Sequence, residues 1–230
     1  MTSEGTAWQI RVRVSATALA ALLATAGVVW CQVATEANRN YQIEQGRAAL
    51  ARGLDSATRN EVQKPAEVVA ALGIKPGATV ADIGTGVGYL LPWLSNAVGA
   101  RGIVLGEDIQ SDFLDIAQKK IADRKLVNVR LVLGAETDPK LPPDAVDLEL
   151  LLDVYHHFDY PDKMLAALAA ALREGGRMAI VEYYRNAMPP GHIRLDRDGV
   201  IRDVEGYGYR LVSRNDHITN QQYLLIFTRK

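Results

Sequence analysis

An apolar run that leads into a glycine-rich turn is the feature that most constrains the fold of this chain. Residues 80–89 read V-A-D-I-G-T-G-V-G-Y, a pattern typical of a buried strand followed by a sharp turn. Glycine adopts the positive φ values that such a turn requires and lets a ligand approach the backbone. A dinucleotide-binding turn needs G-x-G-x-x-G, but Tyr89 occupies the position of its last glycine. The turn therefore predicts a cofactor site that is not of the dinucleotide kind.

Strand and helix patterns alternate along most of the chain. We expect strands at residues 79–83, 102–108, 127–133, 146–152, 177–184, 209–212 and 223–228. We expect helices at residues 65–72, 89–98, 112–123, 161–172 and 196–205. Such alternation predicts an α/β fold with a doubly wound, mostly parallel sheet. The last two strands have no helix between them, which favours antiparallel pairing at the end of the sheet.

The acid two residues before G-x-G-x-G resembles motif I of the class I S-adenosylmethionine-dependent methyltransferases of small molecules. The resemblance covers roughly residues 64–228 and implies their seven-stranded Rossmann-like sheet with an antiparallel last strand. It also implies S-adenosylmethionine as the cofactor. By this resemblance the residues that hold the methionine end of the cofactor are Asp82, Gly84, Thr85, Gly86 and Gly88, and the adjoining Tyr89 is included in the predicted site.

A second acid is expected at the end of the next strand, about 20 residues beyond the glycines, to bind the ribose hydroxyls. Asp108 lies 20 residues beyond Gly88 and is the predicted ribose ligand, with Ile109 beside it. Strand alternation is expected to turn Glu107 to the opposite face. For the adenine contact, the resemblance implies Gly-Asp after the third strand. This chain has Gly134-Ala135-Glu136 instead, so Glu136 or the backbone at Gly134 and Ala135 is expected to serve.

The acceptor side of the site is expected around the segment that follows the fourth strand. Asp153 is placed with the cofactor, and Tyr155 and His156 are the candidate catalytic residues. Histidine titrates in the range that a general base needs, although a purely structural hydrogen bond is an equal alternative for His156. The segment lacks the Asn/Asp-Pro-Pro-Tyr pattern, which disfavours base or amide nitrogen as acceptors. The fifth strand lacks the Asp-Asn pair of the metal-dependent catechol type.

Charge and cysteine content limit the classes of partner and metal site that this chain is expected to have. The net charge of −1 and the pI near 6.4 give no electrostatic reason to expect a nucleic acid partner. Cys31 is the single cysteine, which excludes an internal disulfide and a multi-cysteine metal site. His156 and His157 are adjacent, and we expect neighbours on one element to face different ways. No metal site is therefore predicted.

The N-terminus differs from the rest of the chain. Residues 14–31 carry no charge and follow two arginines, and 18 helical residues would rise roughly 27 Å, close to the thickness of a bilayer. Residues 1–34 are therefore expected to form a membrane anchor or an exported signal segment, with the side of the membrane left open. Residues 35–64 are expected to form a linker helix and a connector. Residues 65–230 form the predicted methyltransferase domain.

The sequence thus favours methyl transfer from S-adenosylmethionine to a small-molecule or lipid-soluble acceptor. Two alternatives remain open: a non-catalytic module that binds S-adenosylmethionine, and an NAD(P)-dependent oxidoreductase. The sequence does not fix the acceptor or the oligomeric state. The predicted cofactor ligands, which are Asp82, Asp108 and the glycines, indicate only that the chain binds a cofactor. They do not distinguish an enzyme from a non-catalytic binding protein.

Overall fold

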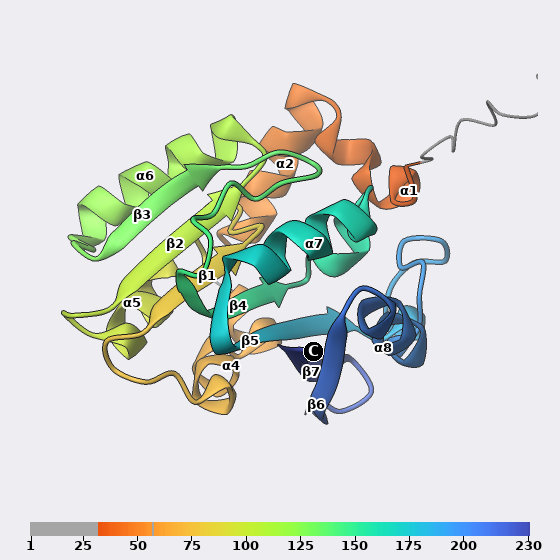
Figure 1. Ribbon diagram of the computed structural model, residues 1–230. Helices are drawn as coiled ribbons and strands as arrows, with labels where there is room; N and C mark the ends of the chain where they lie inside the picture. The colour runs from red at the N-terminus through yellow and green to blue at the C-terminus, as the bar shows by residue number, and fades with distance from the viewer. Residues whose placement is uncertain (1–31, 57) are drawn as a thin grey trace, which may run out of the picture. The chain divides into compact units, whose positions relative to one another are not determined.

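Seven strands form one sheet in the computed structural model, which describes residues 32–56 and 58–230. The strands are β1 (Thr79–Ile83), β2 (Ile103–Asp108), β3 (Val129–Leu133), β4 (Val146–Leu152), β5 (Leu172–Tyr183), β6 (Tyr209–Ile218) and β7 (Gln222–Arg229). Their order across the sheet is β3-β2-β1-β4-β5-β7-β6 (Figure 1). The first five strands pair in parallel, and β7 lies antiparallel to both β5 and β6. This arrangement confirms the predicted seven-stranded sheet with an antiparallel last strand.

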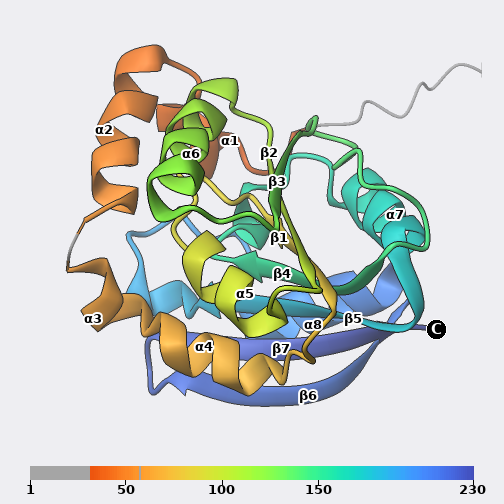
Figure 2. The ribbon, with the colours of Figure 1, turned by 90° about the vertical axis from the view of Figure 1, so that its left-hand side faces the viewer.

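Helices cover both faces of the sheet and bury its apolar side chains. The longer helices are α2 (Glu44–Leu54), α4 (Pro65–Leu72), α5 (Leu91–Val98), α6 (Ser111–Arg124), α7 (Pro161–Ala171) and α8 (Arg197–Gly206). Helices α4, α5 and α6 pack on one face, and α7 and α8 pack on the other (Figures 1 and 2). Each face therefore has its own apolar layer, as the predicted doubly wound fold requires.

Several element boundaries differ from those expected, and three of the differences have a clear structural reason. Helix α5 begins at Leu91 rather than at residue 89, because Gly88 still has a φ of 75° and keeps the turn open. Strand β5 begins at Leu172 rather than at residue 177 and includes Gly175 and Gly176, which lie between the expected helix and the expected strand. The β-hairpin of β6 and β7 is longer than its apolar pattern indicated, because backbone pairing extends β6 through polar residues to Ile218.

The expected linker lies against the domain. Residues 35–64 contain α1 (Thr35–Asn38), the 3-10 turn η2 (Arg39–Tyr41), α2 and α3 (Arg59–Gln63). Arg47 of α2 pairs with Asp112 of α6 at 2.7 Å, and Gln63 donates a hydrogen bond to the Tyr183 hydroxyl at 3.0 Å. Long side chains on α2 and α3 thus reach partners that are distant in sequence, which is why local periodicity indicated only a linker.

The predicted anchor at residues 14–31 lies outside the described residues. Within residues 32–56 and 58–230, no helix combines the length and the apolar character needed to cross a membrane.

Candidate cofactor-binding site

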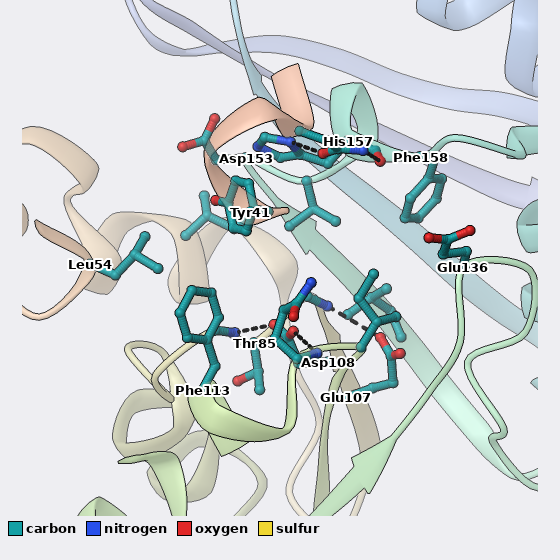
Figure 3. A pocket seen from close by; sticks show the side chains of 18 of the residues that line it. Tyr41, Leu54, Thr85, Glu107, Asp108, Phe113, Glu136, Asp153, His157 and Phe158 are labelled. Atoms are coloured by element: carbon teal, nitrogen blue, oxygen red, sulfur yellow. Dashed lines mark hydrogen bonds between the residues drawn. The ribbon is translucent and has the colours of Figure 1, made fainter. Parts of the chain in front are cut away.

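A cavity opens at the carboxyl ends of β1, β2 and β4, where the strand order reverses between β1 and β4. Ligands in open α/β sheets bind at this type of switch point. The space between the cavity walls, counted together with the open solvent at its mouth, is about 1080 Å³. Figure 3 shows Thr85 and Asp108 on one side, with Asp153 and His157 on the side opposite. Apolar walls come from Leu54, Phe113 and Phe158.

The turn after β1 brings bare backbone to the cavity. Gly84 has a φ of 63° and Gly86 a φ of 56°, values that favour glycine. A Cβ atom on Gly84 would lie 2.7 Å from Cγ2 of Val154, which lies just after β4. Gly84, Gly86 and Val154 all line the cavity. The absence of a side chain at Gly84 therefore permits the close approach of the two strand ends.

Asp82 lies behind this turn rather than in the cavity wall. Its carboxylate accepts a hydrogen bond of 2.6 Å from the Thr85 hydroxyl, and only 3% of the residue is exposed. Burial raises the pKa of Asp82 to about 7. Thr85 itself lines the cavity. Asp82 is thus placed to position the turn through Thr85, whereas the resemblance implied a role near the methionine end of the ligand.

Asp108 joins the end of β2 to the glycine turn. Its Oδ2 accepts a hydrogen bond from the Gly86 N–H at 2.8 Å, and its Oδ1 accepts one from the Gln110 N–H at 2.8 Å. Burial raises the pKa of Asp108 to about 6, although these backbone donors oppose the rise. Asp108 and Ile109 line the cavity. The predicted contact with ribose requires this position.

Glu107 also lines the cavity, so the expectation that it turns to the opposite face is wrong. Its Oε2 accepts a hydrogen bond from the Gly84 N–H at 3.3 Å. Glu107 can make this bond because its long side chain, at the C-terminal end of β2, extends beyond the end of the strand. Burial, and then the charge of Asp108, raise the pKa of Glu107 to about 8. A Cβ on Gly134 would lie 1.8 Å from Glu107 Oε1. Gly134 therefore makes room for Glu107.

The predicted adenine segment reaches the cavity at one residue. Glu136 lines the cavity, whereas Gly134 and Ala135 are not among its lining residues. The N–H of Ala135 instead donates to the Asp138 carbonyl at 2.8 Å and closes a small turn. Gly88 and Tyr89 also lie outside the lining. The Tyr89 hydroxyl donates to Asn60 at 2.9 Å, so this tyrosine contacts the N-terminal segment.

The segment after β4 places one predicted residue in the cavity and two outside it. Asp153 lines the cavity and has a φ of 60°. Burial, and then the charge of Glu182, raise the pKa of Asp153 to about 6. Tyr155 is 2% exposed, and its hydroxyl donates to Asp203 at 2.8 Å. Its pKa is raised by burial and by Asp203, and Tyr155 is not in a position to contact a ligand in the cavity.

His156 is likewise buried beside the cavity rather than in its lining. Its Nδ1 lies 2.7 Å from Glu182 Oε2, and its side chain is 3% exposed. Burial lowers the pKa of His156, but the Glu182 carboxylate and Asp153 outweigh this effect, and the net shift is upward. The structure favours the alternative in which His156 makes a structural hydrogen bond. His157 is the histidine that lines the cavity.

Residues from the N-terminal segment complete the cavity, and no sequence pattern predicted them. Asn38 donates from Nδ2 to the His157 carbonyl and to Asp159 Oδ2, both at 3.0 Å. The Tyr41 ring lies edge-on to His157, with 4.9 Å between ring centroids, and burial, followed by the charge of Asp153, raises the Tyr41 pKa to about 12. Arg59 is the one arginine or lysine among the described lining residues. No spacing rule connects these residues to the glycine turn.

The side chains present fit S-adenosylmethionine. Glu107 Oε1 and Asp153 Oδ1 are buried and have no hydrogen-bond partner among the described residues, and both residues line the cavity. A buried acceptor without a donor costs about 1–3 kcal/mol, which a ligand donor offsets. S-adenosylmethionine carries such donors in its ammonium group, ribose hydroxyls and adenine amino group. Arg59 is a counterpart for its carboxylate. The acids and aromatic rings of the cavity are counterparts for its positively charged sulfonium.

Comparison with known proteins agrees with the geometry. Residues 81–180 match the family described as "Methyltransferase domain". A crystal structure of a SAM-dependent methyltransferase from Aquifex aeolicus superposes with a TM-score of 0.73 at 27% identity, and the match covers 78% of this chain and 96% of that one. The fold and the site define a class I S-adenosylmethionine-dependent methyltransferase. Residues 81–180 match the methyltransferase domain of that family, which confirms the resemblance.

Among named enzymes, the ubiquinone/menaquinone biosynthesis C-methyltransferase UbiE of Vibrio vulnificus is 29% identical over 119 residues, which are 51% of this chain and 46% of that enzyme. An arsenite methyltransferase of Halobacterium salinarum is 27% identical over 131 residues, 57% of this chain and 34% of that enzyme. The match thus spans about half or less of the length of these relatives.

Proposed function

We propose that this chain transfers a methyl group from S-adenosylmethionine to a small, lipid-soluble acceptor. The observation that carries the cofactor part of the proposal is a pair of buried carboxylate oxygens beside the glycine turn, one of Glu107 and one of Asp153, that have no hydrogen-bond partner among the described residues. The name of the UbiE relative supports a quinone-like acceptor class. The aromatic and apolar walls of the cavity provide suitable contacts for such a molecule.

The chain's own residues bind and orient the reactants. The bound cofactor supplies a methyl group on a positively charged sulfur. In this proposal Glu107 and Asp108 accept hydrogen bonds from the ribose hydroxyls, and Arg59 pairs with the carboxylate. The support is that all three residues line the cavity. Tyr41 and Phe158 line the remaining space and exclude water. In-line methyl transfer depends mainly on such alignment and exclusion of water, which supply much of the rate enhancement.

Calorimetry with the full chain tests cofactor choice. S-adenosylmethionine and S-adenosylhomocysteine are each expected to bind one per chain, and NAD is expected not to bind. A preference for NAD would contradict the proposal. Transfer of a labelled methyl group is then measured with quinols, phenols, thiols, amines and arsenite. Turnover with a quinol is the expected result, and binding without turnover of any acceptor would favour the non-catalytic module.

We also propose that residues 14–31 tether the domain to a membrane. The support is the uncharged 18-residue stretch itself. Fractionation of cells that express the full chain, compared with a chain that lacks residues 1–31, tests this proposal. The full chain is expected in the membrane fraction after an alkaline wash, and the shortened chain is not. A mature N-terminus within the apolar stretch would instead indicate an exported domain.

A further inference from the structure

Three of the four histidines of this chain meet at one place beside the cavity. His156 and His157 belong to the 3-10 turn η3 (Tyr155–His157), and His192 lies in the turn after Gly191. The ring centroid of His156 lies 4.0 Å from the ring centroid of His157 and 4.9 Å from that of His192. The expectation that adjacent histidines face different ways is therefore wrong. The 3-10 turn η3 brings these two rings together.

One nitrogen from each ring lies within 4.8 Å of the other two. A tetrahedral zinc-class ion with bonds of 2.0–2.1 Å needs its ligand atoms about 3.4 Å apart. The remaining difference is a small side-chain rotation. His192 is only partly buried and follows a glycine with a φ of 86°, so its turn is the element that adjusts.

Hydrogen bonds fix which nitrogens carry lone pairs. Glu182 accepts through its carboxylate, so His156 Nδ1 is the donor in the 2.7 Å contact. In the neutral ring, which is the form that binds a metal, the lone pair is then on Nε2. His156 Nε2 is buried and has no hydrogen-bond partner among the described residues. An orphaned imidazole nitrogen at a buried position is costly, and a bound ion would remove that cost.

The same logic holds for His157. Asn38 donates from Nδ2 to two carbonyl or carboxylate oxygens, which orients its Oδ1 toward His157 Nδ1 at 2.8 Å. His157 Nδ1 is therefore the donor, and its Nε2 carries the lone pair. Both histidines thus show the arrangement typical of metal ligands, in which the second ring nitrogen donates to a carboxylate or carbonyl oxygen.

We propose that His156, His157 and His192 bind a divalent transition-metal ion of the zinc class at the wall of the cavity. Imidazole ligands favour zinc, copper, nickel and cobalt over magnesium and calcium. Asp153 and Glu182 have oxygens within 4.8 Å of a His156 nitrogen and provide nearby negative charge. Because His157 also lines the cavity, the ion adjoins the space where the acceptor is proposed to bind. The metal site does not depend on the proposed function, since it is measured without cofactor.

The test uses the full chain without an affinity tag, stripped by a chelator and titrated with Co²⁺. Visible absorption of tetrahedral Co²⁺ is expected to saturate at one ion per chain, and Zn²⁺ is expected to displace it. Mg²⁺ is expected to leave the spectrum unchanged. His192→Ala removes a partly exposed ligand and is expected to weaken binding at least about 100-fold. Glu182→Gln should weaken it about 10–100-fold, as the loss of an orienting partner does.

His217→Ala is the matched control, because the His217 ring contacts the Gln63 carbonyl at 2.9 Å and lies outside the cluster. It is expected to bind Co²⁺ like the unaltered chain. Thermal melting checks that each variant is folded. Absence of saturable Co²⁺ binding, equal binding by His192→Ala, or a thiolate band from Cys31 would overturn the proposal. Metal binding that persists when S-adenosylmethionine does not bind would reject the proposed function alone.

Discussion

Asp108 Oδ2 accepts a hydrogen bond from the Gly86 N–H at 2.8 Å and so joins two strand ends that are 22 residues apart. Asp108 Oδ1 accepts a second bond from Gln110. One carboxylate therefore holds both the glycine turn and the start of α6. The acid at the end of β2 has an organising role in addition to its proposed contact with ribose.

Asp108→Asn is expected to weaken S-adenosylhomocysteine binding about 10–100-fold. The amide replaces one acceptor by a donor and removes the charge that strengthens both backbone hydrogen bonds. Calorimetry measures the dissociation constant. Asp115→Asn on the exposed side of α6 is the control and should bind like the unaltered chain. Equal affinities for the two variants would remove Asp108 from the site.

Gly84→Ala is expected to abolish cofactor binding and to destabilise the fold by about 2–3 kcal/mol. The added Cβ meets Val154 at 2.7 Å, in addition to the cost of a positive φ. Gly73→Ala is the matched control, because Gly73 has a φ of 57° and a Cβ there meets nothing within 4 Å. That variant should lose only about 1 kcal/mol and keep full affinity. Chemical denaturation and calorimetry measure the two quantities.

Tyr41→Phe and Tyr155→Phe separate a residue that lines the cavity from one that does not. Tyr155→Phe removes a buried hydrogen bond to Asp203 and should cost about 1–2 kcal/mol of stability while turnover is retained. Tyr41→Phe keeps the ring and removes the hydroxyl of a residue that lines the cavity, so it is expected to lower turnover with little effect on stability. The measurements are thermal melting and initial rates with the acceptor that the methyl-transfer screen identifies. A larger loss of turnover in Tyr155→Phe than in Tyr41→Phe would support a catalytic role for Tyr155.

Glu149 is expected to destabilise the core of the sheet. It is fully buried on β4, neither carboxyl oxygen has a partner among the described residues, and burial raises its pKa well above the usual range. Glu149→Met, of similar volume, is expected to raise the free energy of unfolding by about 1–3 kcal/mol. Glu149→Gln keeps the polar burial and removes only the ionisation. A loss of stability in Glu149→Met would show that this carboxyl has a favourable contact.

Stability without cofactor is expected to fall as the pH rises from 5 to 9. The folded-state pKa values of Asp108, Asp82 and Glu107 are raised to about 6, 7 and 8, mainly by burial. The folded protein therefore binds more protons than the unfolded chain, and the stability that this provides is lost as the pH passes through these values. The slope is at most about 1.4 kcal/mol per pH unit for each proton.

Denaturation at pH 5, 7 and 9 measures this effect, and Glu107→Gln should flatten the fall between pH 7 and 9. Saturating S-adenosylhomocysteine should also flatten it, because its donors stabilise the ionised carboxylates. If Glu107→Gln shows the same slope as the unaltered chain, another group is responsible.

Much of the fold could be predicted because its signals are local. The strand at Thr79–Ile83 and the strand at Val146–Leu152 have the boundaries expected from their apolar runs. The antiparallel end of the sheet followed from the lack of a helix between two strands. Strand β5 was predicted short, because its pairing across Gly175 and Gly176 depends on a neighbouring strand rather than on its own sequence.

The sequence by itself determined the family, the sheet and the β1 turn with its acid at residue 108, because spacing along one chain fixes backbone turns and strand ends. Only the tertiary structure decided what surrounds them. It placed Tyr41, Asn38 and Arg59 at the cavity and moved Tyr155 and His156 behind its wall. It also brought His192 to His156 across 36 residues of chain. Such contacts depend on packing between elements distant in sequence, and no local pattern encodes them.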